Sequence, residues 1–296
     1  MQRIARQLRS RLLPCLLALV AASAAWADGA HHSLWVVKGH GNQLVLLGSV
    51  HVLKPDDSQL PPEALQAYAR ATALVMELDL NALKPEDMML SMATLGALPP
   101  EQTLQQELGP ALYARFAAQA RADGLDAALL EHLQPWMAAL MLDQAQMARL
   151  GYETAAGVDQ QFAQRAAADH KRIIGLETVD EQLGLFAQLS REQQQHYLRY
   201  TLDEHDRAAG ELKAMVAAWQ AGDTRTLERL LTEGFEDFPD LFRTLTTERN
   251  RRWLQTLEPL LNGTQDYLVV VGALHLVGKD GLVALLRERG YSVEQH

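Results

Sequence analysis

The stretch that decides the fold is YLVVVGALH at residues 267–275, in which an apolar run leads into a glycine and ends at His275. A second stretch, QLVLLGSVH at residues 43–51, follows the same plan and ends at His51. In both, the histidine stands three positions after the glycine. Short aliphatic runs bounded by glycine are typical of strands that are buried on both faces of a sheet. Each stretch therefore predicts a buried strand with a histidine just beyond its carboxyl end.

The segments around these two strands complete an α/β pattern. Residues 34–38 precede the turn sequence GHGN at 39–42, and together with residues 43–48 they predict a hairpin. A proline-led helix is expected to run to about residue 70, followed by a short buried strand at 73–76. Further along the chain we expect a helix at 157–168, a strand at 171–176, a helix at 282–289 and a closing strand at 291–293.

We therefore predict an α/β protein with a central β-sheet built from the N- and C-terminal parts of the chain. Helices flank this sheet, and a helical insertion interrupts it, with mainly helical segments at about 85–150 and 179–260. Within the second segment we expect breaks at Gly210, at Gly222-Asp223, at Gly234 and at Pro239. Because no linker rich in proline, glycine or serine divides residues 28–296, we treat them as one domain.

The first 27 residues have the features of an export signal. Four arginines lie before residue 12, an apolar run follows at 12–22, and Ala25-Trp26-Ala27 is a small-x-small cleavage sequence. The apolar run is shorter than the roughly 20 residues that a membrane-spanning helix needs. We expect cleavage near Ala27, a periplasmic or secreted protein, and no stable membrane insertion afterwards.

Composition excludes several classes of function. Loss of four arginines with the signal changes the net charge from −10 to −14, and it also removes Cys15, the single cysteine. A chain without cysteine has neither thiolate chemistry nor disulfides. An acidic surface disfavours nucleic acid and anionic lipid as partners, so we expect a peptide or small-molecule substrate. The oligomeric state does not follow from the sequence.

Four predicted strands end close to a polar side chain that can bind metal: His51, Glu77, Glu177 and His275. Ligands of open α/β sheets collect beyond the carboxyl ends of the strands, so these four side chains are expected to meet. Two imidazoles with one or two carboxylates suit zinc, manganese or cobalt. The spacing alone also fits histidines that are ordinary hydrogen-bonded loop residues. Asp159 likewise fits a helix N-cap.

Several motifs together resemble the TraB/GumN family, and they cover nearly all of the chain from residue 34 to 293. The motifs are LLGSVH (46–51), VMELD (75–79), GVD (157–159), GLETVDEQ (175–182), AWQAGD (218–223), ERN (248–250) and VGALHLVG (271–278). The resemblance implies a link to the TIKI proteins, which are metal-dependent proteases with two Gly-x-x-His motifs, and a more distant link to erythromycin-esterase-like hydrolases. His51 and His275 match the two motif histidines, and Glu77 matches the acidic residue that follows the second core strand. Some bacterial members are associated with polysaccharide gene clusters or with pheromone shutdown.

Our leading hypothesis is a periplasmic metal-dependent hydrolase that acts on peptide bonds with a metal-activated water. His51, Glu77 and His275 hold one divalent ion (manganese, cobalt or zinc), Glu177 transfers the proton, and Arg249 stabilises the oxyanion. Asp79, Asp159 and Asn250 orient these groups by hydrogen bonds without binding the metal themselves.

Two alternatives stay open. In the first, a metal-independent hydrolase uses His51 as general base, oriented by Glu77. In the second, the protein is a non-catalytic periplasmic binding or accessory protein linked to envelope polysaccharide. The sequence HExxH of ordinary zincins is absent, and so is the GxSxG of serine hydrolases.

Overall fold

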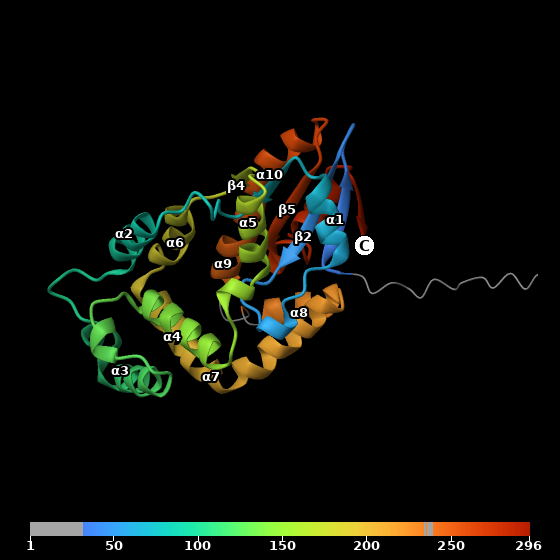
Figure 1. Ribbon diagram of the computed structural model, residues 1–296. Helices are drawn as coiled ribbons and strands as arrows, with labels where there is room; N and C mark the ends of the chain where they lie inside the picture. The colour runs from blue at the N-terminus through green and yellow to red at the C-terminus, as the bar shows by residue number, and fades with distance from the viewer. Residues whose placement is uncertain (1–31, 234, 236–238) are drawn as a thin grey trace, which may run out of the picture.

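A mixed six-stranded sheet forms the centre of the protein, with its strands in the order β4-β3-β5-β2-β1-β6 (Figure 1). This computed structural model describes residues 32–233, 235 and 239–296. The predicted export signal therefore lies outside the described residues, and so does the predicted break at Gly234. Within the described part of the chain, no helix is both long and apolar enough to span a membrane.

The hairpin and the parallel strands lie where the sequence predicts them. Strands β1 (Leu34–Lys38) and β2 (Gln43–Ser49) pair antiparallel, and β6 (Ser292–Gln295) pairs antiparallel with the outer side of β1. Strand β5 (Tyr267–Gly272) lies between β2 and β3 (Ala73–Met76), parallel to both. The three-residue β4 (Ile173–Gly175) pairs in parallel with β3. The carboxyl ends of β2, β3, β4 and β5 therefore meet at one edge of the sheet.

Alternation along the strands divides the core between the two faces of the sheet. Leu268 and Val270 of β5 pack toward α1 (Pro62–Arg70) and α5 (Val158–Ala168). Val269 and Val271 pack on the opposite face, toward α10 (Glu248–Leu261) and α11 (Leu282–Glu288). All four of these side chains are fully buried. Burial on both faces explains why the central strands are continuous apolar runs in the sequence.

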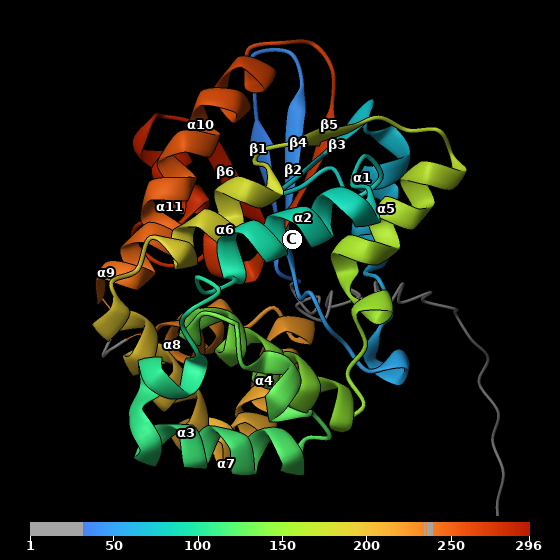
Figure 2. The same cartoon turned by 90° about the vertical axis from the view of Figure 1, so that its left-hand side faces the viewer.

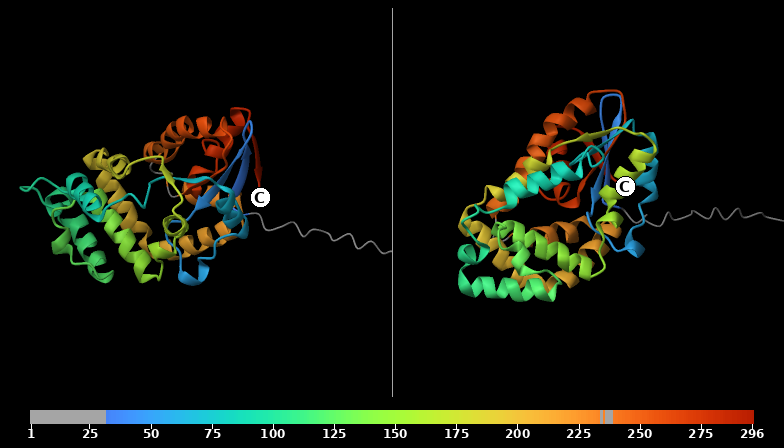
Figure 3. Two further views of the ribbon diagram at one scale, coloured as in Figure 1. Left: turned by 45° about the horizontal axis from the view of Figure 1, so that its top comes forward. Right: turned by 60° about the vertical axis from the view of Figure 1, so that its left-hand side comes forward.

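The helical insertion lies to one side of the sheet (Figure 3). It has its own core, which Leu104, Phe116 and Leu198 help to form. Its elements are α2 (Pro85–Gly96), α3 (Leu104–Ala122), α4 (Pro135–Arg149), α6 (Val179–Ala187), α7 (Arg191–Gln220), α8 (Thr224–Glu233), α9 (Pro239–Phe242) and a π-helical turn (Arg243–Thr247) that leads into α10.

The predicted break at Gly210 is wrong, because α7 continues through this residue from Arg191 to Gln220. A glycine inside a helix costs about 1 kcal/mol relative to alanine. Helix α7 offsets this cost through its Ser190 capping box and its packing against α4, α3 and α8. The predicted interruption at Gly222-Asp223 is confirmed, since α7 ends before it and α8 begins after it. At the predicted break at Pro239, the new helix α9 begins.

Candidate active site

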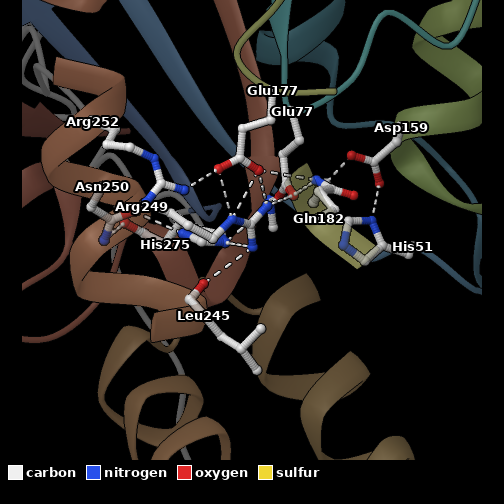
Figure 4. A network of polar contacts seen from close by, with 12 residues as sticks. His51, Glu77, Asp159, Glu177, Gln182, Leu245, Arg249, Asn250, Arg252 and His275 are labelled. Atoms are coloured by element: carbon white, nitrogen blue, oxygen red, sulfur yellow. Dashed lines mark hydrogen bonds and ion pairs between the residues drawn. The ribbon is translucent and has the colours of Figure 1, made fainter. Parts of the chain in front are cut away.

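The four polar residues that follow the parallel strands gather at one edge of the sheet (Figure 4). His51 stands two residues after β2, Glu77 directly after β3, and Glu177 two residues after β4. His275 ends the short 3-10 turn Ala273–His275 that follows β5. Arg249, Asn250 and Arg252 come from α10, and Asp159 comes from the first turn of α5.

His275 is buried, and its contacts define its tautomer. The Asn250 amide nitrogen donates to the backbone oxygens of His275 and Asp280, so the amide oxygen is left to accept the Nδ1–H of His275 at 2.7 Å. Nε2 of His275 then accepts from Nη1 of Arg249 at 3.0 Å. Burial lowers the pKa of His275 to about 3, so the ring is neutral at physiological pH. The indole of Trp253 packs against this ring, with the two centroids 4.3 Å apart.

Glu77 is a buried carboxylate that is held ionised. Its Oε1 accepts the Gly272 N–H at 2.8 Å, and its Oε2 accepts from Arg249 at 2.7 Å and from Gln182 at 3.0 Å. Burial by itself would raise the pKa of Glu77, but the charges of His51 and Arg249 and the bond from the Gly272 N–H hold this pKa below its ordinary value.

His51 lies on the open side of the site, with 63% of its side chain exposed. Its Nδ1 is 2.8 Å from Oδ2 of Asp159, and Ser49 donates to the other oxygen of that carboxylate at 2.8 Å. The Asp159 carboxylate raises the pKa of His51, although desolvation opposes this effect. Asp159 does not cap α5, because Gly157 holds the N-cap position. The carboxylate that orients His51 is thus Asp159, and not Glu77 as the metal-independent alternative supposes.

The Arg249 guanidinium occupies the middle of the site, with all five of its N–H groups engaged. Nε donates to Glu177 at 2.9 Å, and Nη2 donates to Glu177 at 2.8 Å and to Glu77. Nη1 donates to His275 and to the backbone oxygen of Leu245 in the π-helical turn. Burial opposes the charge of Arg249, but Glu77 and Glu177 keep its pKa above the ordinary value. The guanidinium is therefore the cation that two buried carboxylates share.

Both oxygens of Glu177 are already engaged by arginine. Besides Arg249, Arg252 donates to Oε1 at 3.1 Å, and the Glu177 side chain is only 2% exposed. The general acid–base role predicted for Glu177 would require one of these ion pairs to open. The Arg252 pair is the one that can exchange with solvent, because 48% of the Arg252 side chain is exposed.

The three predicted metal ligands surround Gly272. A Cβ at this position would lie 3.3 Å from Oε1 of Glu77, 3.5 Å from Nε2 of His51 and 3.7 Å from Cδ2 of His275. Each imidazole has Nδ1 held by an oxygen acceptor, which leaves Nε2 of His51 for a metal, whereas Nε2 of His275 becomes a ligand only when it exchanges its bond from Arg249 Nη1. The chemistry of these donors fits a divalent ion. Among the described residues, no group of three or more His, Asp or Glu side chains is already close enough to form a metal site.

Asp79 is placed differently from the prediction. Its Oδ1 accepts the backbone N–H groups of Asn81 and Ala82, so the carboxylate stabilises the turn after β3. An aspartate can satisfy such a turn within its own segment, and the hydrogen bonds of the Asp79 carboxylate in the described structure go to this turn and not to an imidazole.

Sequence analysis did not single out Gln182, Arg252 or the backbone N–H of Gly272. Gln182 lies at the end of the GLETVDEQ motif and contacts both Glu77 and Glu177. Its neighbour Glu181 closes a capping box with Thr178, which fixes the first turn of α6. The first two residues carried a signal, because Gln182 is part of that motif and Arg252 belongs to a basic run in an acidic chain. Nothing in the sequence marked the N–H.

The sequence of the chain is similar to those of several known proteins. The chain matches the TraB/PrgY/gumN family over residues 33–295. It is 27% identical over 242 residues to the uncharacterized protein YbaP of Escherichia coli, covering 82% of this chain and 87% of YbaP. It is also 26% identical over 164 residues to a metalloprotease TIKI homolog of Nematostella vectensis, covering 46% of this chain and 35% of that protein. No solved structure matches the chain.

Proposed function

The chain belongs to the TraB/PrgY/gumN family, and from this membership and its site we propose that it is a metal-dependent hydrolase of peptide bonds. The observation that carries the proposal is the convergence of His51, Glu77 and His275 around Gly272. Three separate strand ends supply these side chains, and two of them are histidines with oriented rings. The likeness to a metalloprotease TIKI homolog supports the same class of chemistry. From the composition of residues 1–27 we further propose that the mature protein is periplasmic or secreted.

His51, Glu77 and His275 would hold the ion. A divalent ion bound there would polarise the scissile carbonyl and bring the pKa of a water molecule toward about 7. Asp159 and Asn250 fix the two imidazoles through Nδ1, and Nε2 of His275 would bind the ion once it gives up its bond from Arg249. Manganese, cobalt and zinc all accept this set of nitrogen and oxygen donors.

Arg249 is the electrophilic group of the site. Since its five N–H groups all have partners, it binds a developing oxyanion by exchanging one partner for the substrate. Nη1 can exchange its bond to His275 or to Leu245 for a bond to the substrate, because Glu77 and Glu177 then both keep their bonds to Arg249. Glu177 anchors the guanidinium in this position, and it takes up a proton only when its contact with Arg252 opens.

One observation favours a second candidate, a metal-independent hydrolase. His51 is largely exposed and its ring is fixed by Asp159, so that its neutral form, which dominates above its raised pKa of about 9, acts as a general base that takes a proton from water. Metal removal separates the two candidates. Only a metal-dependent hydrolase loses its activity when a chelator removes the metal and regains it when a divalent ion is added back.

The experiment combines metal analysis with an activity screen. The mature protein is purified without added metal, analysed for metal content, and incubated with a peptide library whose products are read by mass spectrometry. We expect hydrolysis that chelation abolishes and that manganese, cobalt or zinc restores. His51→Ala and His275→Ala should lose both the metal and the activity. His40→Ala is the matched control, because His40 is exposed in the hairpin turn before β2, away from the site.

Two results would overturn the proposal. Full activity after complete metal removal would favour His51 as a general base. Ligand binding without turnover under any metal would support the non-catalytic binding or accessory function.

A further inference from the structure

A cavity of about 310 Å³ lies beside the active site, between α2, α6 and the loop that follows β3. Figure 2 shows α2 and α6 side by side in front of the sheet. Two sets of lining residues determine what the cavity can bind, one apolar and one acidic. The apolar group consists of Leu78, Ala82, Leu83, Met88 and Val179, and the acidic group consists of Asp79, Asp87 and Asp180.

The cavity adjoins the proposed reaction centre. Glu177, which anchors Arg249, is also one of the residues that line the cavity. Leu78 and Asp79, which also line the cavity, directly follow Glu77 in the chain. A substrate whose scissile bond lies at Arg249 therefore has a neighbouring part within reach of the cavity.

The walls select an apolar group. The cavity is close to the lower limit of about 300 Å³ for small-molecule sites, which suits one large side chain better than an extended ligand. Met88 adds a flexible thioether that adapts to different apolar shapes. On the same helix, Met89 and Leu90 are 71% and 66% exposed, so the apolar surface extends outside the cavity.

The rim selects positive charge. Within the described parts of the chain, Asp79, Asp87 and Asp180 form no ion pair, and Asp87 and Asp180 are exposed. In the part of the chain that the structure describes, no lysine or arginine lines the cavity. Three carboxylates of one sign around an apolar space attract a cationic partner and repel an anionic one.

We infer that this cavity is the specificity pocket of the enzyme, and that it binds an apolar side chain flanked by lysine or arginine in a peptide substrate. The inference rests on the proposed peptidase function. Three features together define the occupant: the pocket adjoins the site, its walls fit an apolar side chain, and its rim complements basic neighbours.

Direct binding tests the pocket without requiring turnover. The probe is a fluorescein-labelled pentapeptide, Ala-Lys-Leu-Lys-Ala, made non-cleavable by N-methylation of its backbone, and its affinity is read by fluorescence anisotropy. Ala82→Phe places a ring in the cavity from an exposed position, and Ala93→Phe is the control on the exposed face of α2, outside the lining. We expect Ala82→Phe to weaken binding about tenfold or more, and Ala93→Phe to leave it unchanged.

The charge requirement has its own matched pair. Asp87→Asn combined with Asp180→Asn should weaken binding of the lysine peptide roughly threefold to tenfold at low salt, with little effect at high salt. Glu86→Gln, one residue from Asp87 but outside the lining, should change nothing. A peptide with glutamates in place of the lysines should bind wild type less tightly than the lysine peptide does.

The outcomes separate this inference from the proposed function. If the probe peptide binds to wild type but not to Ala82→Phe, and the protein cleaves no peptide, the pocket is supported and the peptidase function is rejected. Peptide cleavage whose sequence preference is the same in wild type and Ala82→Phe supports the peptidase and overturns the pocket. Equal binding of the lysine and glutamate peptides also overturns it.

Discussion

Replacement of Arg249 by methionine tests the network on which the site depends. Methionine preserves much of the aliphatic length but none of the five N–H groups, so Glu77 and Glu177 both lose their shared cation. Glu77 keeps the Gly272 N–H and Gln182, and Glu177 keeps Arg252. Removal of one partner from a buried ion pair typically costs about 3–5 kcal/mol, because a charge is left without compensation. The Arg249 side chain is only 8% exposed, so solvent screens little of this loss.

We therefore expect Arg249→Met to lower the free energy of unfolding by about 3–5 kcal/mol, which corresponds to a fall in Tm of roughly 6–15 °C for a domain of this size. Urea and thermal unfolding followed by circular dichroism measure both quantities. Arg249→Lys keeps the charge but not the planar fork, and it should lose about half as much. Adding Glu77→Gln to Arg249→Met should recover at least about 1 kcal/mol, since Glu77 is the carboxylate that keeps only neutral donors, Gly272 and Gln182, when Arg249 is lost.

Arg251→Met is the matched control, two residues further along the same helix. Arg251 is 63% exposed and 3.7 Å from Asp280, so its loss should change stability by no more than about 0.5 kcal/mol. If Arg249→Met proves as stable as Arg251→Met, the two carboxylates are not held by a buried arginine and the description of the site is wrong.

Three further changes test other parts of the site and fold. Gly272→Ala places a Cβ 3.3 Å from the Glu77 carboxylate and 3.5 Å from the His51 ring. Metal affinity and activity should therefore fall at least about tenfold, while the circular dichroism spectrum stays that of the folded wild type. Unchanged metal affinity would refute the convergence of the three side chains around this glycine. Asp159→Asn removes the charge that orients His51, and competition with a coloured chelator should show a 10–100-fold loss of metal affinity, roughly; Asp169→Asn, which contacts Tyr68 instead, should show none. Burial raises the pKa of Asp143 to about 6, although Tyr197 and His205 oppose the shift, so the folded state retains a proton that the unfolded state releases above about pH 4. This contribution to stability is fully present below about pH 4 and is lost as the pH rises to about 6. In urea unfolding, the free energy of unfolding of Asp143→Asn should therefore match that of wild type at pH 4 and exceed it by roughly 1–2 kcal/mol at pH 7. An equal difference at both pH values would contradict the assignment.

The strands and the residues that follow them could be predicted from the sequence, because both follow from local rules. A strand buried on both faces must be apolar throughout, so the runs at β2, β3 and β5 are visible without coordinates. The carboxyl ends of parallel neighbours meet at one edge, and for that reason His51, Glu77, Glu177 and His275 were expected together. The family motifs pointed to Arg249 and Asn250 as well.

Only the tertiary structure decided which group contacts which. Arg249 lies 172 residues from Glu77 and 72 residues from Glu177, and no local pattern encodes its place between them. Asp159 orients His51 because α5 packs next to the end of β2, whereas Asp79 satisfies its own turn. Continuity of α7 through Gly210 depends in the same way on the helices packed against it. Pairings of this kind depend on the relative positions of whole elements, and packing of the core sets those positions only when the chain has folded.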